Sequence, residues 1–148
     1  FGKRQDPNGS YAAVIPKWIN AMLNDDEVFI NGDGETSRDF CYIKNAVQAN
    51  ILAATVTNKK PMNQIYNIAL NERTSLNKLY SIIESLLIKK GLRDSKQSPI
   101  YRDFREGDVR HSQADISKAK KLLGYKPKYK IQNGIEEAME LYRNCHES

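Results

Sequence analysis

Two arginines and one aspartate are the residues of this chain whose types and settings best suit the binding of a phosphate-bearing ligand. Arg38 follows a glycine turn at residues 32–34, and Arg105 and Asp108 lie on either side of a glycine in a second polar segment. A guanidinium group can donate paired hydrogen bonds to phosphate oxygens and stays charged at any working pH. A nearby carboxylate can accept hydrogen bonds from ribose hydroxyls. These three residues therefore suit the polar parts of a nucleotide.

The same residues also allow purely structural interpretations. Arg38 could form an ion pair with its neighbour Asp39. The segment around Arg105 and Asp108 could be a charged surface turn before a helix that Asp115 caps. Residue types alone leave these interpretations open, and the order of motifs along the chain has to decide between them.

A complete catalytic constellation is missing from the 148 residues. His111 and His146 are the only histidines, and neither has a plausible triad partner in the sequence. No tyrosine is followed four residues later by lysine, and Ser37 stands where the glycine turn would need a third glycine to form Gly-x-Gly-x-x-Gly. Cys41 and Cys145 lie far apart, without metal-ligand spacing. The sequence predicts binding chemistry, with no catalytic set, metal site or disulfide.

The length of 148 residues and the composition, 40% hydrophobic and 28% charged, predict one globular domain. The net charge of +5 could serve nucleic acid or a small phosphate-bearing ligand. Much of the excess comes from lysines between residues 118 and 130, which we interpret as the solvated face of a helix and loop. We therefore expect no nucleic-acid partner.

The chain shows no signal for a membrane or an export pathway. It contains no run of about 18 apolar residues and no basic segment followed by an apolar leader. We expect no membrane partner and a cytoplasmic location. The chain opens at Phe1 rather than at a methionine, and we interpret it as a fragment.

Apolar periodicity and turn residues predict an α/β arrangement. Residues at helical spacing predict helices over 14–23, 44–57, 76–90, 116–123 and 132–144. β-rich runs predict strands over 27–30, 37–43, 64–70 and 100–104. Thr74 and Ser75 are expected to cap the third helix, and Gly91 and Gly124 to end the third and fourth. Residues 1–10 are expected to form an exposed loop.

Five motifs, in this order, resemble the extended short-chain dehydrogenase/reductase family of sugar-nucleotide epimerases and dehydratases. They are Phe-Gly-Lys-Arg-Gln at 1–5, Val-Ile-Pro at 14–16, Gly-Asp-Gly-x-x-x-Arg-Asp-Phe at 32–40, Arg-x-Gly-Asp at 105–108, and Ala-Asp-x-x-Lys-Ala with Leu-Gly-Tyr-x-Pro between 114 and 127. The resemblance covers essentially the whole chain. Residues 4–9 and 108–115 most resemble the bacterial UDP-N-acetylglucosamine (or uronic acid) 4-epimerases.

The resemblance implies that residues 1–148 are the C-terminal, UDP-sugar-binding portion of such an enzyme. In the family, an N-terminal Rossmann domain carries the glycine loop for NAD and the catalytic Tyr-x-x-x-Lys pair. Both are expected upstream of Phe1, so this chain alone should be inactive and should bind no cofactor. The implied reaction inverts sugar C4 by transient hydride transfer to NAD, with a tyrosinate as base. The implied parent is a homodimer that acts on UDP-N-acetylhexosamines for surface-polysaccharide and lipopolysaccharide synthesis.

The resemblance also assigns individual residues to the substrate. Arg38 and Arg105 are expected on the UDP diphosphate, and Asp108 on the uridine ribose. Further residues are expected to line the nucleotide and sugar pocket or to lie near its mouth: Ala13, Val14 and Asn31 in the wall, and Gln5 at the mouth.

Ser112 takes the position at which, in the family, a bulky aromatic side chain would exclude a 2-acetamido group. Because a serine leaves room there, N-acetylated UDP-hexoses are expected to be admitted. The structural alternative is that this serine merely belongs to the approach to the next helix.

Residues 43–70 are expected to return to the Rossmann domain. The apolar faces of the helix at 44–57 and the strand at 64–70 would then be uncovered in this chain. Two functional alternatives stay open. One is a sister reaction on the same scaffold, by a dehydratase, a decarboxylase or a uronic acid epimerase, and the other is a non-catalytic nucleotide-binding module.

Overall fold

The computed structural model describes residues 1–6, 8–9 and 13–146, without the side chains of 141–146. Residues 7 and 10 of the expected N-terminal loop, residues 11–12, and the side chains of Cys145 and His146 lie outside this description. Helices and short strands alternate, which confirms the α/β class. The elements are α1 (Val14–Leu23), β1 (Phe29–Asn31), β2 (Ser37–Arg38), α2 (Ile43–Thr55), β3 (Thr74–Ser75), α3 (Leu76–Lys89), β4 (Ile100–Arg102), α4 (Ser117–Leu123) and α5 (Ile131–His146).

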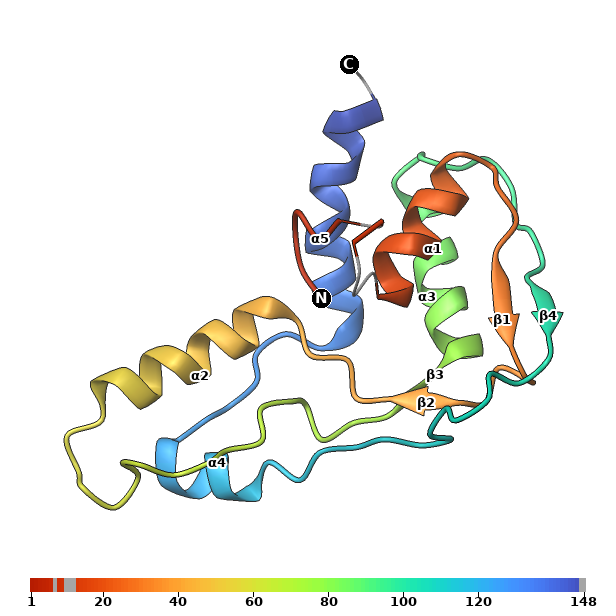
Figure 1. The fold of residues 1–148 in the computed structure, drawn as a ribbon. Helices are drawn as coiled ribbons and strands as arrows, with labels where there is room; N and C mark the ends of the chain where they lie inside the picture. Colours follow the sequence, from red (N-terminus) through yellow and green to blue (C-terminus); the bar gives the residue numbers. More distant parts are fainter. Residues whose placement is uncertain (7, 10–12, 147–148) are drawn as a thin grey trace.

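α1, α3, α5 and the segment of β1 build the larger core, and the exposed strand β4 lies beside β1 (Figure 1). β1 and β4 are parallel, with Phe29 opposite Ile100 and Asn31 opposite Arg102. α1 contacts both α3 and α5, because each helix presents an apolar face. The most deeply buried side chains of this core are Ile15, Ile19, Met22, Ile30, Leu79, Ile83, Leu86, Leu87, Ile135 and Met139. This core fixes the directions of α1 and β1, which both carry residues of the candidate site.

A smaller core lies at the other end of the molecule, where α2 contacts α4 (Figure 1). Ala49 packs there with Ala119 and Tyr125. Asn45, which is 1% exposed, ties α2 to the segment before α5. Its side-chain oxygen accepts hydrogen bonds from the N–H groups of residues 128 and 129, and its amide group donates to the carbonyl of residue 129. This buried amide therefore has partners for both of its ends.

The antiparallel β2–β3 pair lies between the two cores (Figure 1), with Ser37 opposite Ser75 and Arg38 opposite Thr74. The strand expected over 37–43 is shorter than predicted. The start of α3 at Leu76 limits the pairing at its Ser37 end, and beyond Arg38 the Asp39 carboxylate accepts the N–H groups of residues 70 and 71 in place of a continued ladder. The Ser75 hydroxyl accepts the N–H of residue 78 at 3.3 Å, which confirms the predicted cap.

The strand expected over 64–70 is wrong, because no strand forms there in the described part of the chain. Ile65 is 88% exposed. The N–H groups of residues 70 and 71 donate to the Asp39 carboxylate at 3.0 and 2.9 Å, and the Tyr125 hydroxyl donates to the carbonyl of residue 69. A β-rich run becomes a strand only beside a partner backbone, and here side chains satisfy these backbone groups.

The predicted helices are confirmed with small shifts at their ends. Gly91 and Gly124 have φ angles of 66° and 67°, the left-handed conformation that commonly follows a helix. α4 begins at Ser117, one residue later than predicted, and the Asp115 carboxylate accepts the Ser117 N–H at 2.8 Å. None of the described helices is long and apolar enough to cross a membrane.

Candidate functional site

A hollow of about 340 Å³ collects side chains from separate segments of the chain. Arg38, Arg105 and Asp108, the residues expected around a diphosphate and a ribose, all line it, together with Val14 and Asn31. The remaining residues of its wall are Lys17, Trp18, Phe29, Thr36, Phe40 and Leu76. The fold thus brings five of the eight expected residues into one concavity.

Secondary-structure spacing explains most of this wall. From α1 come residues 14, 17 and 18, which share one helix face. From the extended segments come alternate residues, which share one face of a strand: 29 and 31, then 36, 38 and 40. Sequence reasoning missed six of the lining residues, although extending this periodicity from Val14, Asn31 and Arg38 would have found five of them: Lys17, Trp18, Phe29, Thr36 and Phe40. Leu76 lies at the start of α3 and carried no such signal.

The hollow is positively charged. Its described wall contains the guanidinium groups of Arg38 and Arg105, the ammonium group of Lys17, and one carboxylate, that of Asp108. The side chains of Lys17 and Arg105 make no hydrogen bond or ion pair with another described residue. Such unmatched cations in a concavity favour an anionic ligand.

Polar contacts fix the Arg38 guanidinium in the wall. Its Nη2 forms an ion pair with the Asp108 carboxylate. Its Nη1 donates to the carbonyl of Ser37 at 2.9 Å and, more weakly, to the carbonyl of Arg110 at 3.5 Å. Asp108 therefore meets Arg38 at the edge of the same hollow.

The interpretation in which Asp39 neutralises Arg38 is wrong in this structure. The Asp39 carboxylate accepts hydrogen bonds from the N–H groups of residues 70 and 71, and from that of Ala114 at 3.4 Å. Asp39 thus ties the end of β2 to the segment before β3 and to the polar segment that carries Asp108. Its role is structural, and Arg38 finds its carboxylate partner elsewhere.

Both glycines of the turn at 32–34 face a side chain that leaves no space for a Cβ atom. A Cβ on Gly32 would lie 2.3 Å from the Phe104 ring, and one on Gly34 would lie 1.9 Å from the Asn77 side-chain oxygen. The φ angles of 75° and 78° at the two glycines also favour a residue without a side chain. The turn therefore fits tightly between Phe104, which follows β4, and Asn77 of α3.

The aspartate of this turn joins it to the segment that follows Asp108. The Asp33 carboxylate accepts the N–H of Glu35 at 2.9 Å and pairs with the Arg110 Nη2 at 2.5 Å. The hydrogen bond from Arg110 is the main cause that lowers the pKa of Asp33 to about 2, and the same bond raises the pKa of Arg110. Sequence reasoning missed this pair, because no pattern links two charges 77 positions apart.

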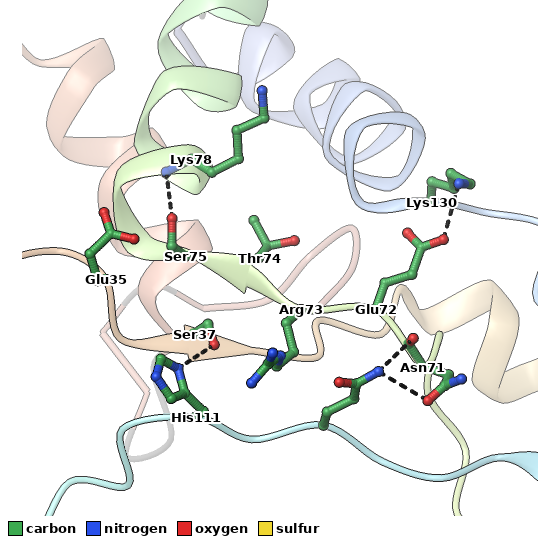
Figure 2. Close-up of a pocket in the computed structure, with 11 residues that line it drawn as sticks. Glu35, Ser37, Asn71, Glu72, Arg73, Thr74, Ser75, Lys78, His111 and Lys130 are labelled. Carbon is green, nitrogen blue, oxygen red and sulfur yellow. Dashed lines mark hydrogen bonds and ion pairs between the residues drawn. The ribbon is translucent and has the colours of Figure 1, made fainter.

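A second, broader hollow of about 810 Å³ is lined by residues 71–75 and by Glu35 and Ser37, which alternate with Thr36 and Arg38 of the first hollow (Figure 2). In its wall, the Ser37 hydroxyl and His111 Nδ1 are hydrogen-bonded at 2.9 Å. The Gln113 side chain donates to the carbonyl of Asn71 at 2.8 Å. These bonds fasten residues 111–113 along β2 and the segment before β3. The Arg73 side chain reaches into the same region (Figure 2) without a hydrogen bond or ion pair to another described residue.

The remaining expected residues do not line the first hollow. Ala13 directly precedes α1, and Gln5 is half-buried in the N-terminal segment. Ser112 is exposed, and its N–H donates to the carbonyl of Ser37 at 3.0 Å.

Comparison with known proteins indicates the family of the chain. The model of the NAD dependent epimerase/dehydratase family matches residues 1–69, a range that includes α1, the glycine turn and Arg38. The chain belongs to this family. A putative UDP-glucose 4-epimerase of Methanocaldococcus jannaschii is 37% identical over 144 residues, which are 97% of this chain and 43% of the relative.

Similarity to a solved epimerase structure extends over nearly the whole chain. The UDP-N-acetylglucosamine 4-epimerase of Methanobrevibacter ruminantium M1, in complex with UDP-N-acetylmuramic acid, superposes with a TM-score of 0.84 at 40% identity, over 98% of this chain and 44% of that one. The relatives differ in reaction: a UDP-N-acetyl-alpha-D-glucosaminuronate decarboxylase of Bacillus cytotoxicus is 27% identical over 92% of this chain and 41% of its own length. The chain spans less than half the length of each of these relatives.

The residues that line this hollow are not of the types that bind NAD or that take part in hydride transfer. Within the described ranges of the chain, no tyrosine, histidine or cysteine lines the hollow. The 148 residues contain neither a Gly-x-Gly-x-x-Gly loop nor a Tyr-x-x-x-Lys pair. Among the described residues, no group of three or more His, Cys, Asp or Glu side chains could hold a metal ion. The arrangement can bind and orient an anionic ligand.

Proposed function

We propose that this chain is the substrate-binding part of an NAD-dependent UDP-N-acetylhexosamine 4-epimerase, of the UDP-GlcNAc/UDP-GalNAc type. The observation that carries the proposal is that Arg38, Arg105 and Asp108, from distant parts of the sequence, line one hollow. In the proposed complex, the two guanidinium groups hold the diphosphate and the carboxylate accepts the ribose hydroxyls.

The wall of the hollow supports a nucleotide rather than inorganic phosphate alone. Trp18, Phe29, Phe40 and Leu76 offer apolar and aromatic surface for a planar base. Asn31 is exposed at the end of β1 and can donate and accept hydrogen bonds at the edge of the base or sugar. A volume of about 340 Å³ lies within the range of small-ligand sites.

Calorimetric titration of the chain with UDP tests the nucleotide site. We expect Arg38→Ala and Arg105→Ala each to weaken the affinity for UDP by about tenfold to a hundredfold, as for the loss of charged hydrogen bonds. Arg73→Ala is the matched control, because it removes an equally charged, unpaired side chain from the other hollow. Equal losses in all three variants would mean that only the overall charge matters, and the proposed site would be wrong.

Catalysis and NAD binding are assigned to residues outside these 148, since neither motif occurs within them. NAD should therefore leave the calorimetric signal of this chain unchanged, while UDP produces one. In the longer protein, cytoplasmic and homodimeric on this proposal, we expect interconversion of UDP-GlcNAc and UDP-GalNAc for surface-polysaccharide synthesis. A product assay on that protein separates epimerisation from dehydration and decarboxylation.

Residues 43–70 are proposed to pack against the NAD-binding part of the longer protein. Along α2, Ile43, Val47 and Ile51 recur every four residues and are 48%, 46% and 57% exposed. Val47 and Ile51 also line a hollow of about 470 Å³ with Leu52 and Tyr129. An apolar stripe of this kind on a soluble surface favours burial against another body.

A further inference from the structure

The loop that carries Arg105 and Asp108 is not held by burial. Every residue from 103 to 110, here called the capping loop, is exposed. Within the loop, the N–H of Asp108 donates to the carbonyl of Arg105 at 3.2 Å, and Gly107 makes the bend with a φ angle of 73°. Since an exposed loop has many accessible conformations, contacts at its two ends must set its position.

Both ends of the capping loop are attached to the same turn. At the first end, the Phe104 ring lies against Gly32, where a Cβ atom would come within 2.3 Å of it. At the other end, the Arg110 guanidinium pairs with Asp33 at 2.5 Å. The Arg110 guanidinium also lies 5.1 Å from the centre of the Phe104 ring, within the range of a cation–π contact. The two ends are thus joined to each other and to neighbouring residues of the turn.

These attachment residues stand apart from the hollow. None of Asp33, Phe104 and Arg110 lines it, so a change at these positions leaves the wall residues chemically intact. Arg38 makes further side-chain contacts with the loop, an ion pair with Asp108 and a weak hydrogen bond to the Arg110 carbonyl at 3.5 Å, and both Arg38 and Asp108 are assigned to the ligand in the proposed complex. The attachment to the turn therefore does not compete with the ligand, and neither does the backbone hydrogen bond from the Ser37 N–H to the Arg110 carbonyl at 2.9 Å.

We infer that Asp33, Phe104 and Arg110 are positioning residues, which hold the capping loop so that Arg105 and Asp108 face a bound UDP moiety. The inference rests on the proposed nucleotide site. A loop that is already ordered loses less conformational entropy when the ligand binds. The Asp33 charge is then useful although it is negative and lies near an anion site, because it anchors Arg110.

The sign of the effect of Asp33→Asn tests this inference. If Asp33 acted only through its charge, its neutralisation would tighten binding of anionic UDP. If it anchors the loop, the same change weakens UDP binding, by about threefold to tenfold. Glu106→Gln is the matched control: it removes a negative charge from the capping loop itself, where Glu106 has no hydrogen bond or ion pair to another described residue. The control should bind UDP as tightly as the wild type, or more tightly.

A double-mutant cycle adds a second readout. Because Asp33 and Arg110 act as a pair, we expect the variant Asp33→Asn/Arg110→Gln to bind UDP no more weakly than Arg110→Gln alone. Additive losses, or tighter binding in Asp33→Asn, would overturn the inference. Circular dichroism of each variant checks that the fold is kept.

Hydrogen–deuterium exchange of the capping-loop amides distinguishes failure of the inference from failure of the proposed function. Asp33→Asn and Phe104→Ala should speed exchange of amides 103–110 without ligand, whereas Glu106→Gln should not. If the wild-type chain binds no UDP, the proposed function is wrong. The exchange data then still decide whether Asp33 and Phe104 hold the capping loop. Unchanged exchange in both Asp33→Asn and Phe104→Ala would show that these residues do not hold the loop.

Discussion

The Arg38 guanidinium forms an ion pair with the carboxylate of Asp108, 70 positions further along the chain. This pair joins β2 to the capping loop and places a cation and an anion side by side at the edge of the hollow. A nucleotide presents the complementary pattern, an anionic diphosphate next to ribose hydroxyls. The two residues of the pair can therefore bind different parts of a nucleotide, Arg38 the diphosphate and Asp108 the ribose.

Replacement of Asp108 by Asn separates these two functions. We expect the affinity for UDP to fall by about tenfold, because charged hydrogen bonds to the ribose are lost. The affinity for inorganic pyrophosphate should be unchanged or higher, because Arg38 loses its competing carboxylate. Calorimetric titration with each ligand measures both values. A parallel loss for UDP and pyrophosphate would show that Asp108 acts by holding Arg38 rather than by binding ribose.

The size of the side chain at position 112 is predicted to select the sugar. In the longer protein, Ser112→Tyr should lower kcat/KM for UDP-N-acetylglucosamine at least about tenfold and spare UDP-glucose, because a bulky wall excludes the acetamido group. Ser112→Ala is the control and should keep both substrates. Steady-state assays with the two UDP-sugars give the ratio. If Ser112→Tyr lowered both activities equally, this residue would not be a specificity determinant.

Acid should weaken the attachment of the capping loop at a defined pH. Asp33 has a pKa of about 2 in the folded chain, below its ordinary value of 3.8. A lowered carboxylate pKa stabilises the fold fully above the ordinary value, and this contribution is lost as the pH falls through the folded value. The difference in free energy of unfolding between wild type and Asp33→Asn should thus be constant above about pH 5 and shrink between about pH 4 and pH 2. Urea unfolding at each pH measures it, and a difference that persists undiminished at pH 2 would contradict the prediction.

The exposed stripe on α2 should make the isolated chain associate with itself. Val47→Glu/Ile51→Glu should lower the sedimentation-derived mass toward that of the monomer, since charges on this face oppose apolar contact. Ala53→Glu adds a charge at an exposed position of the same helix, outside the stripe, and should leave association unchanged. A wild-type chain that sediments as a monomer at all concentrations would argue against an interface on this face.

Local sequence patterns predicted most elements, because helix and strand periodicity are properties of neighbouring residues. The apolar spacing of α1 and α3 and the glycines after α3 and α4 are examples. The strand expected over 64–70 failed, because strand formation depends on a partner backbone and not on β-rich composition alone. The motif order placed Arg38, Arg105 and Asp108 in one site, but it did not reveal that Arg38 pairs with Asp108. Pairings across such sequence distances are set by the packing of both cores.

A crystal structure of the chain with UDP tests the central claim most directly. We predict that diphosphate oxygens lie within about 3.2 Å of guanidinium nitrogens of both Arg38 and Arg105, the usual limit for such hydrogen bonds. The ribose hydroxyls should lie at the same range from Asp108. A diphosphate bound elsewhere on the surface, or held in this hollow by neither arginine, would contradict the assignment of a nucleotide-sugar site.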